Sequence, residues 1–537
     1  MKRYINILMV ALATMMTSCL TEDPRDQLYE EDIYNNANNI YINAVAVLYN
    51  YIGGSADSEG LQGTCRGIYD YNTLTTDEAM IPIRGGDWYD GGLWTNMYQH
   101  KWSPNDLPLY NTWKYLYKVV VLSNKSLHII DKYSHNLSEE QRVAYEAEVR
   151  ALRALFYYYI MDMYGRVPIV TSYEQPQDEV VQSERSEVFR FIVNELQEVA
   201  ELLPNERSNK MGNYYGRITT PVANFLLAKL ALNAEIYCDD NWTDGVPRNG
   251  KEIFFTVDGE KLNAWQTCIK YCNKLAEVGY RLEDDYSYNF SVHNENSNEN
   301  IFTIPLDKNL YAAQFWYLFR SRHYNHGGAL GGSSENGTSA NISTVLANGY
   351  GTDDVDARFE KNFYAGIVEV DGKPVMMDNG QQLEYFPLEL KLNLTGSPYV
   401  KTAGARMAKY EVDRTSHSDG RQPDNDIVLF RYADALLMKS EAKVRNGEDG
   451  SLELNEVRGR VGMPYREATL ENILKERLLE LVWEGWRRQD MVRFGVYHKS
   501  YDQRVQLADE KNGYTTVFPI PQKSIDLNPK LKQNVGY

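Results

Sequence analysis

Cysteine, histidine and long apolar runs are scarce in this chain of 537 residues. There are five cysteines and eight histidines. Beyond the N-terminus, no run reaches the ~18 apolar residues of a membrane-spanning helix. Cations are also in the minority, with 56 Lys and Arg against 74 Asp and Glu and a net charge of −18. This balance argues against a nucleic-acid ligand and against binding an anionic bilayer through basic patches.

The scarcity of cysteine and histidine limits metal and disulfide chemistry. Four cysteines follow Cys19: Cys65, Cys238, Cys268 and Cys272. They allow three disulfide pairings, between which the sequence does not choose. Cys268 and Cys272 lie four residues apart on an expected helix without zinc-site spacing around them, which favours buried thiols. His323 and His326 are weak metal candidates, so we expect no metal site and no cofactor; a structural calcium ion is compatible with the sequence but not predicted.

Residues 1–18 are predicted to be a signal peptide. Lys2 and Arg3 form a charged start, and the apolar region that follows is too short to span a membrane. Small residues directly before Cys19 resemble a bacterial lipobox, which implies cleavage there and acylation of Cys19. Because each buried methylene contributes about 0.8 kcal/mol, two or three acyl chains anchor a protein firmly. Residues 19–32 are then expected to form a lipidated tether.

Helical periodicity dominates residues 33–279 and 427–497, which predicts a mainly α fold. The expected helices cover residues 33–52, 110–133, a segment capped at Ser138, 186–203, 220–237, 262–278 and a segment that begins at Ile427. Their spacing suggests helix–turn–helix units of about 30–40 residues that form a tetratricopeptide-like repeat scaffold. Residues 280–426 are rich in Gly, Asn, Ser and Asp. They predict a loop-rich, irregular insert within a single body of residues 33–537.

Aromatic residues are concentrated between Arg84 and Trp102. This stretch contains Trp88, Tyr89, Trp94, Tyr98 and Trp102, and two glycine pairs interrupt it. Its apolar residues follow neither a helical nor a strand period, so we expect a loop. Such a loop is either buried around its own aromatic core or a ligand platform. In the second case a pyranose stacks on a Trp ring, and its hydroxyls bond to carboxylate and guanidinium groups.

Two groups of charged residues elsewhere are candidate catalytic groups, but their sequence context favours a structural role. Glu480, Glu484, Arg487, Arg488 and Asp490 form a charged pattern typical of ion pairs between and along helices. Trp483 and Trp486, in the same segment, are expected in the core. The adjacent pair Asp77 and Glu78 is poorly placed to flank a glycosidic bond. No convergent acid–base or metal set is evident, so we expect no enzyme.

Five motifs carry a resemblance to a known family. They are AEVRALRALFYYYIMDMYGRVPIV (147–170), FRYADALLMKSEA (430–442), LNEVRGRVG (454–462), ERLLELVWEGWRRQDMVRFG (476–495) and FPIPQKSIDLNPKLKQNVGY (518–537). Together with the lipobox they closely resemble the SusD/RagB family of Bacteroidetes outer-membrane lipoproteins. The resemblance implies a tetratricopeptide-like body with a loop-rich ligand face. It also implies capture of a glycan at the cell exterior and delivery to a SusC-like TonB-dependent barrel transporter.

The resemblance also suggests site residues. Arg66 stands where glycan-binding relatives have a sugar-contacting arginine. Ile81 and Ile83 replace the expected aromatic residues, so Trp88 or Trp94 is expected to take over the platform. Trp316 is the candidate for a second wall. The first candidates are Arg66, Trp88 and Trp316, followed by Arg84, Asp87, Tyr89, Trp94 and Asn96.

Three functions are compatible with these features of the sequence. The favoured one is non-catalytic glycan binding in nutrient uptake. The alternative with the same fold is peptide binding, although a peptide site needs hydrogen-bonding backbone edges more than stacking tryptophans. A glycoside hydrolase is the least favoured, for want of a convergent catalytic set.

Overall fold

The computed structural model describes residues 30–310, 316–417 and 421–537, with the side chains of 316–318 excluded. The predicted signal peptide and Cys19 lie outside these residues. Residues 30–32, expected in the tether, instead begin helix α2 (Glu30–Ile33). Glu30 pairs with Lys132 of the body at 2.9 Å, so residues that the sequence assigned to the tether contact the helical body. Within the described ranges, no helix combines the length and apolarity needed to cross a membrane.

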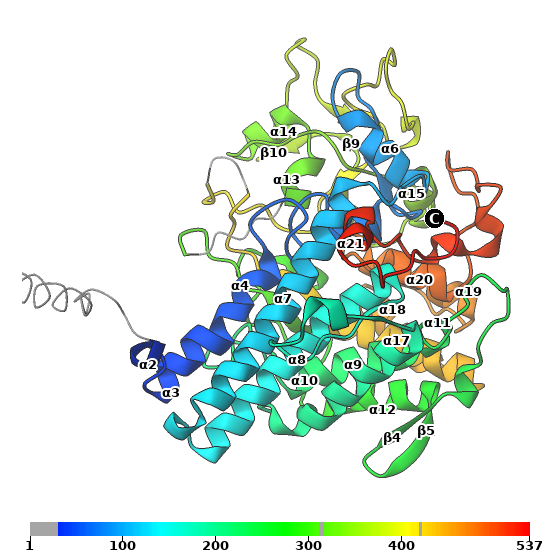
Figure 1. The fold of residues 1–537 in the computed structure, drawn as a ribbon. Helices are drawn as coiled ribbons and strands as arrows, with labels where there is room; N and C mark the ends of the chain where they lie inside the picture. Colours follow the sequence, from blue (N-terminus) through cyan, green and yellow to red (C-terminus); the bar gives the residue numbers. More distant parts are fainter. Residues whose placement is uncertain (1–29, 311–315, 418–420) are drawn as a thin grey trace, which may run out of the picture.

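The long helices stack into one body (Figure 1). Helix α7 packs on α8, α8 on α9, and α10 on α12. Helix α12 then packs on α17, although the whole insert separates the two in sequence. The mainly α, tetratricopeptide-like scaffold is therefore confirmed. The helices of the body are α3 (Ala37–Ile40), the π-helix η1 (Tyr41–Ala46), α4 (Val47–Gly53), α5 (Ile68–Thr73), α6 (Leu93–Tyr98), α7 (Leu107–Lys132), α8 (Glu139–Tyr164), α9 (Arg185–Val199), α10 (Thr220–Leu232), α11 (Ala234–Tyr237), α12 (Ala264–Glu277), α17 (Tyr432–Asn446), α18 (Ser451–Arg460), α19 (Leu470–Leu481), α20 (Arg487–Arg493) and α21 (Gln522–Leu527).

Helix ends follow the signals in the sequence. The Ser138 hydroxyl accepts the Gln141 N–H at 3.2 Å, and the Gln141 side chain accepts the Ser138 N–H at 3.0 Å, which is the predicted capping box. Pro221 occupies the first turn of α10. Gly447 ends α17 with a φ of 92°, a left-handed conformation that favours glycine.

The expected helix start at Ile427 is wrong. Residues Ile427–Arg431 form strand β14, which pairs antiparallel with β6 (Asn300–Ile304), and α17 begins only at Tyr432. Every residue of both strands is buried. A short apolar run with both faces covered has no strand alternation, so its periodicity cannot be told from that of a buried helix.

The insert consists of short elements at one end of the helical body, near α6 (Figure 1). Its helices are α13 (Trp316–Ser321), α14 (Tyr324–Ala329), α15 (Ile342–Ala347) and α16 (Phe359–Asn362). The remaining strands of the described chain are β1 (Ala79–Met80), β2 (Val167–Pro168), β3 (Gln182–Ser183), β4 (Phe254–Val257), β5 (Glu260–Asn263), β7 (Ser339–Ala340), β8 (Phe363–Tyr364), β9 (Gly366–Ile367), β10 (Glu369–Val370), β11 (Lys373–Pro374), β12 (Glu384–Tyr385) and β13 (Arg406–Met407). β1, which precedes the aromatic loop, pairs with β7 of the insert and joins the two at that end.

The charged motif of the C-terminal helices forms a buried ionic lattice, as the sequence suggested. Glu480 binds Arg358 at 2.7 Å and Arg431 at 2.6 Å, and all three side chains are almost fully buried. Most partners are distant in sequence, whereas the Asp490–Arg493 and Glu441–Arg445 pairs, at 2.8 and 2.7 Å, have helical i, i+3 and i, i+4 spacing. Removing one partner of such a buried pair typically costs about 3–5 kcal/mol, because the other charge stays desolvated.

The remaining structural expectations concern tryptophan and cysteine. Trp483 and Trp486 are 0% and 3% exposed, so both belong to the core. Cys65, Cys268 and Cys272 are buried and Cys238 is half-buried, all as free thiols. Burial raises the pKa of the Cys65 thiol to about 12. These cysteines therefore act as small packing groups.

Candidate functional site

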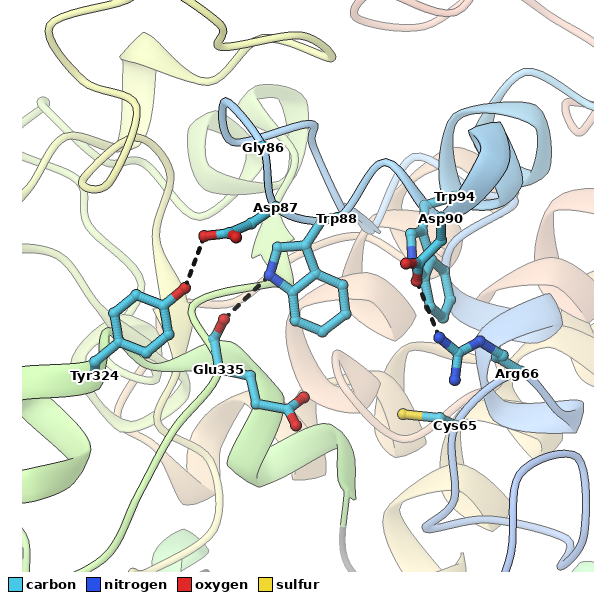
Figure 2. A pocket seen from close by; sticks show the side chains of 9 residues that line it. All are labelled: Cys65, Arg66, Gly86, Asp87, Trp88, Asp90, Trp94, Tyr324 and Glu335. Atoms are coloured by element: carbon cyan, nitrogen blue, oxygen red, sulfur yellow. Dashed lines mark hydrogen bonds and ion pairs between the residues drawn. The ribbon is translucent and has the colours of Figure 1, made fainter.

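A polar pocket opens where the aromatic loop meets the insert. Its volume is about 480 Å³. Three segments contribute to it: the loop before α5, the aromatic loop itself, and the insert around α14 (Figure 2). We call it the Trp88 pocket; its lining residues are Cys65, Arg66, Gly86, Asp87, Trp88, Asp90, Trp94, Tyr324 and Glu335.

Trp88 is held as a wall of the pocket. Its indole N–H donates to the Glu335 carbonyl at 3.1 Å. Part of the ring lies against Gly337, where an added Cβ would come within 2.7 Å of the indole. The side chain is nevertheless only half-buried, so part of the ring remains open to the pocket. An anchored, partly exposed indole is suited to stacking against an apolar ligand face.

Trp94 supports the wall and is itself covered. It is 1% exposed. The guanidinium carbons of Arg66 and Arg320 lie 5.5 and 5.3 Å from the ring centroid. The Trp94 indole N–H donates to Asp90 at 2.8 Å, and the ring meets Trp88 edge-on at a centroid distance of 6.0 Å. Trp94 therefore fixes the orientation of Trp88 and Asp90, and its own ring has little area exposed for stacking.

Arg66 is positioned by carboxylates on either side. Its guanidinium binds Asp57 at 2.5 Å and Asp90 at 2.9 Å. Its backbone N–H donates to Asp70 at 2.7 Å, and Asp70 forms a fully buried ion pair with Arg320 at 2.5 Å. The buried Asp70–Arg320 pair thus holds the Arg66 backbone in place, while the Arg66 side chain stays about one third exposed.

Three lining residues have an unusual backbone. Arg66, Trp88 and Asp90 have φ values of 58°, 63° and 41°. Non-glycine residues pay a conformational cost there, of order 1–3 kcal/mol each, and such residues cluster at binding and active sites. Glycine at the same positions would relieve the strain but remove the side chains that line the pocket. The strained backbone thus occurs at residues whose side chains line the pocket.

The lining carries more carboxylates than cations. Asp87 accepts the Tyr324 hydroxyl at 3.0 Å and lies 3.4 Å from the Lys401 ammonium. Figure 2 shows the Glu335 side chain extending beneath the Trp88 ring. Burial raises the pKa of the Glu335 carboxyl, and the positive charge of Arg320 opposes that effect. The lining therefore combines an aromatic wall with hydrogen-bond acceptors and donors, the set that recognises hydroxyl-rich ligands.

The structure brings half of the predicted site residues together. Arg66, Asp87, Trp88 and Trp94 line one pocket. Tyr89 is 58% exposed beside it, and Asn96 is exposed on α6. Neither lines the pocket. Their predicted ligand contacts, like those of the four lining residues, stay predictions.

Arg84 has a different environment from the one expected of a ligand contact. It is 2% exposed, and its guanidinium donates to the Val400 carbonyl at 3.0 Å and the Ser339 hydroxyl at 2.8 Å. These bonds tie the aromatic loop to the insert. Trp316 begins α13, but its side chain lies outside the described residues, so its role as a second wall stays a prediction.

Five lining residues were missed by sequence reasoning: Cys65, Gly86, Asp90, Tyr324 and Glu335. Asp90 lies in the same loop as Trp88 and could have been named from its acidic character alone. Tyr324 and Glu335 come from the glycine-rich part of the insert, which drew attention only through His323 and His326. Desolvation lowers the pKa of His323 to about 4 and of His326 to about 3, so both are neutral at pH 7. Among the described residues no group of three or more His, Cys, Asp or Glu is arranged for a metal ion.

Comparison with known proteins matches two parts of the chain to family models. Residues 332–537 match the SusD family model, and residues 32–232 match a SusD-like model described as starch-binding and associating with the outer membrane. The starch-binding protein SusD of Bacteroides thetaiotaomicron is 24% identical to the chain over 540 residues, which covers 90% of this chain and 89% of SusD.

Solved structures share the whole architecture. The surface glycan-binding protein A of Bacteroides thetaiotaomicron, solved with laminarihexaose, has a TM-score of 0.70 at 21% identity and covers 93% of this chain and 99% of its own. A laminarin-binding SusD-like protein has a TM-score of 0.67 at 19% identity, with 94% of this chain and 100% of its own covered. At these identities the likeness establishes the fold.

The fold and the pocket define a class: a helical-repeat body with an irregular face that presents an aromatic, polar pocket. Two SusD models match successive parts of the chain, and SusD-like structures share its fold over nearly its full length. The chain belongs to the SusD family.

Proposed function

We propose that this protein binds a glycan at the cell surface and does not cleave it. The observation that carries the proposal is the Trp88 ring, which is anchored by Glu335 and Gly337 and partly open beside Asp87, Asp90 and Arg66. A sugar ring can stack its CH face on the indole while its hydroxyls bond to these groups. The laminarihexaose and laminarin ligands of SusD-like relatives support this choice of ligand.

The carboxylates that first suggest catalysis have other partners. Asp77 forms a bidentate ion pair with Arg487, with N–O distances of 2.6 and 2.7 Å. Glu78 is 1% exposed and accepts the Trp483 N–H at 2.8 Å. Neither residue lines the Trp88 pocket. Within the pocket, Asp90 is already bound by Arg66 and by the Trp94 indole.

The proposal extends to location and delivery. The protein is held at the outer membrane by acyl chains on Cys19 and faces the cell exterior. It passes its glycan to a SusC-like TonB-dependent barrel transporter. Support comes from the lipobox resemblance and from the outer-membrane association in the family description. Because a shallow pocket gives modest affinity, capture close to the transporter would raise the effective ligand concentration there.

Affinity electrophoresis of the chain after Cys19 tests the proposal. The protein migrates through gels that contain plant, fungal, bacterial or host polysaccharides. We expect retardation by at least one polymer, loss of that retardation in Trp88→Ala, and no new reducing ends. Release of reducing ends would instead establish catalysis, with Glu335 as the first acid to test because its pKa is raised. No retardation by any polymer would overturn glycan binding and favour a peptide ligand.

A further inference from the structure

A second cavity lies away from the Trp88 pocket, along helix α7. Its volume is also about 480 Å³. One wall is a stripe of α7, the other is the segment from Pro168 to Val180, and the C-terminal region around α21 closes the cavity. We call it the α7 groove; its lining residues are Tyr110, Trp113, Lys114, Tyr117, Lys118, Val121, Leu122, Pro168, Val170, Gln177, Val180, Ser524, Leu527, Asn528 and Leu531.

The walls of the α7 groove are bonded to one another. The Tyr117 hydroxyl donates to the Pro168 carbonyl at 2.9 Å. Across the groove, the Asn528 side chain donates to the Val180 carbonyl at 2.9 Å. These bonds link α7 to the extended segment, and that segment to the chain end. The groove is therefore preformed, which lowers the entropic cost of binding a partner.

The surface of the α7 groove is apolar and exposed. Val121 is 45% and Leu527 is 66% exposed, and the neighbouring Val181 is 55% exposed. Behind them, Trp113 packs on Tyr117 at a centroid distance of 4.7 Å. Exposed aliphatic residues around aromatic anchors are typical of protein interaction surfaces, because desolvation of such a patch stabilises the complex.

The charged residues that line the α7 groove are positive, while the exposed Asp178, Glu179 and Asp526 lie beside the lining on the same segments. The lining has two lysines and no carboxylate, in a chain with a net charge of −18. Lys114 and Lys523 place their ammonium groups 4.7 and 5.1 Å from the Tyr110 ring, and Lys118 lies 4.6 Å from the Tyr51 ring. Each of the three lies over an aromatic ring at the rim of an apolar cleft. Such a rim attracts carboxylates and repels cations.

We propose that the α7 groove is a docking site for a segment of another protein that presents large apolar side chains flanked by carboxylates. The apolar side chains cover Trp113, Val121 and Leu527, and the flanking carboxylates meet the lysines of the rim. Gln177, Ser524 and Asn528 also line the groove. The Gln177 and Asn528 side chains already donate to the Leu527 and Val180 carbonyls, at 3.4 and 2.9 Å, and a peptide backbone can hydrogen-bond to the Ser524 hydroxyl.

Two synthetic peptides test the proposal on the full chain after Cys19. One has central leucine and phenylalanine residues flanked by glutamates, and its twin has lysines in place of the glutamates. Calorimetry should show at least about tenfold tighter binding of the glutamate peptide. Val121→Glu and Leu527→Asp, both at exposed positions, should abolish that binding while glycan retardation stays unchanged. The unchanged glycan binding shows that the variants are folded.

Charge reversal gives the sharper result. The triple variant Lys114→Glu, Lys118→Glu, Lys523→Glu should bind the lysine peptide better than the glutamate peptide. The proposal is overturned if the triple variant still prefers the glutamate peptide, or if the parent chain binds neither peptide. Binding to phosphatidylglycerol vesicles that depends on Leu527 also overturns it, because such binding would assign the groove to lipid. A dimer that Val121→Glu dissociates would assign it to a second copy of this chain.

Discussion

The Trp88 pocket and the α7 groove have the same volume, about 480 Å³, and opposite chemistry. Each is built around a tryptophan. Trp88 is half-buried among Asp87, Asp90, Glu335 and Arg66, whereas Trp113 is 7% exposed among rings and aliphatic side chains. Size alone therefore says nothing about the ligand. The polarity of the lining and the exposure of the ring separate the proposed site for hydroxyl-rich ligands from the proposed docking surface.

The largest expected difference is in how much stability the protein loses when each tryptophan is replaced by alanine. Trp113→Ala should lower the free energy of unfolding by about 3–5 kcal/mol, because it leaves a cavity under α7. Trp88→Ala should cost clearly less, about 1–2 kcal/mol, because its ring is half-exposed. Urea denaturation followed by circular dichroism measures both. An equal loss in the two variants would show that the aromatic loop is a buried core and not a platform.

The next difference is in glycan affinity. Trp88→Ala should weaken binding of the retarding polysaccharide by at least about tenfold, or 1.4 kcal/mol. Gly337→Ala should also weaken it, because its Cβ would come within 2.7 Å of the Trp88 ring and displace it. Gly328→Ala is the matched control, since an added Cβ there meets nothing within 4 Å. Affinity electrophoresis compares the three; an unaffected Gly337→Ala variant would argue against the fixed ring as the platform.

Charge selectivity should also differ between the two cavities. The carboxylates of the Trp88 pocket should exclude uronate-rich or sulfated polysaccharides in favour of neutral ones, by a few-fold at physiological ionic strength. The double variant Asp87→Asn, Glu335→Gln should reduce that discrimination. Gels with neutral and anionic polymers of similar size measure it. Tight binding of an anionic polymer by the parent chain would contradict this prediction.

The smallest expected effect is the pH dependence of glycan binding. The pKa of Glu335 is raised, so its carboxylate gains a proton at a higher pH than an exposed glutamate does. If the carboxylate accepts a sugar hydroxyl, affinity falls as the pH drops through this pKa, by about 1 kcal/mol for one hydrogen bond. Calorimetry between pH 7 and pH 4 measures the change. Glu335→Gln should bind with no such dependence, and a parallel decline in both would assign the effect to another group.

Much of the scaffold could be predicted from the sequence because its signals are local. The capping box at Ser138 and the terminal glycine of α17 mark helix ends that the structure places at those residues. The start at Ile427 was wrong because β14 is buried on both faces, and its pairing with β6 depends on residues over a hundred positions away. Local periodicity carries no information about such a pairing.

The pocket was predictable only in part, for the same reason. Trp88, Asp87 and Trp94 come from one conspicuous loop, and Arg66 came from the family resemblance. Arg84, from the same loop, turns inward to the Val400 and Ala403 carbonyls of the insert. Composition does not distinguish an arginine that binds its own backbone from one that faces a ligand, because both are flanked by polar residues.

The sequence by itself determined the helical scaffold, the membership of the SusD family and the loop from which the pocket is built. Tertiary structure alone decided that Tyr324 and Glu335 face that loop, that Trp94 is covered while Trp88 stays open, and that the chain end completes a groove on α7. The physical reason is the distance along the chain over which the interactions act. Helix caps and periodicity act over a few residues, whereas a cavity and its electrostatics are sums over side chains that meet only after the chain has folded.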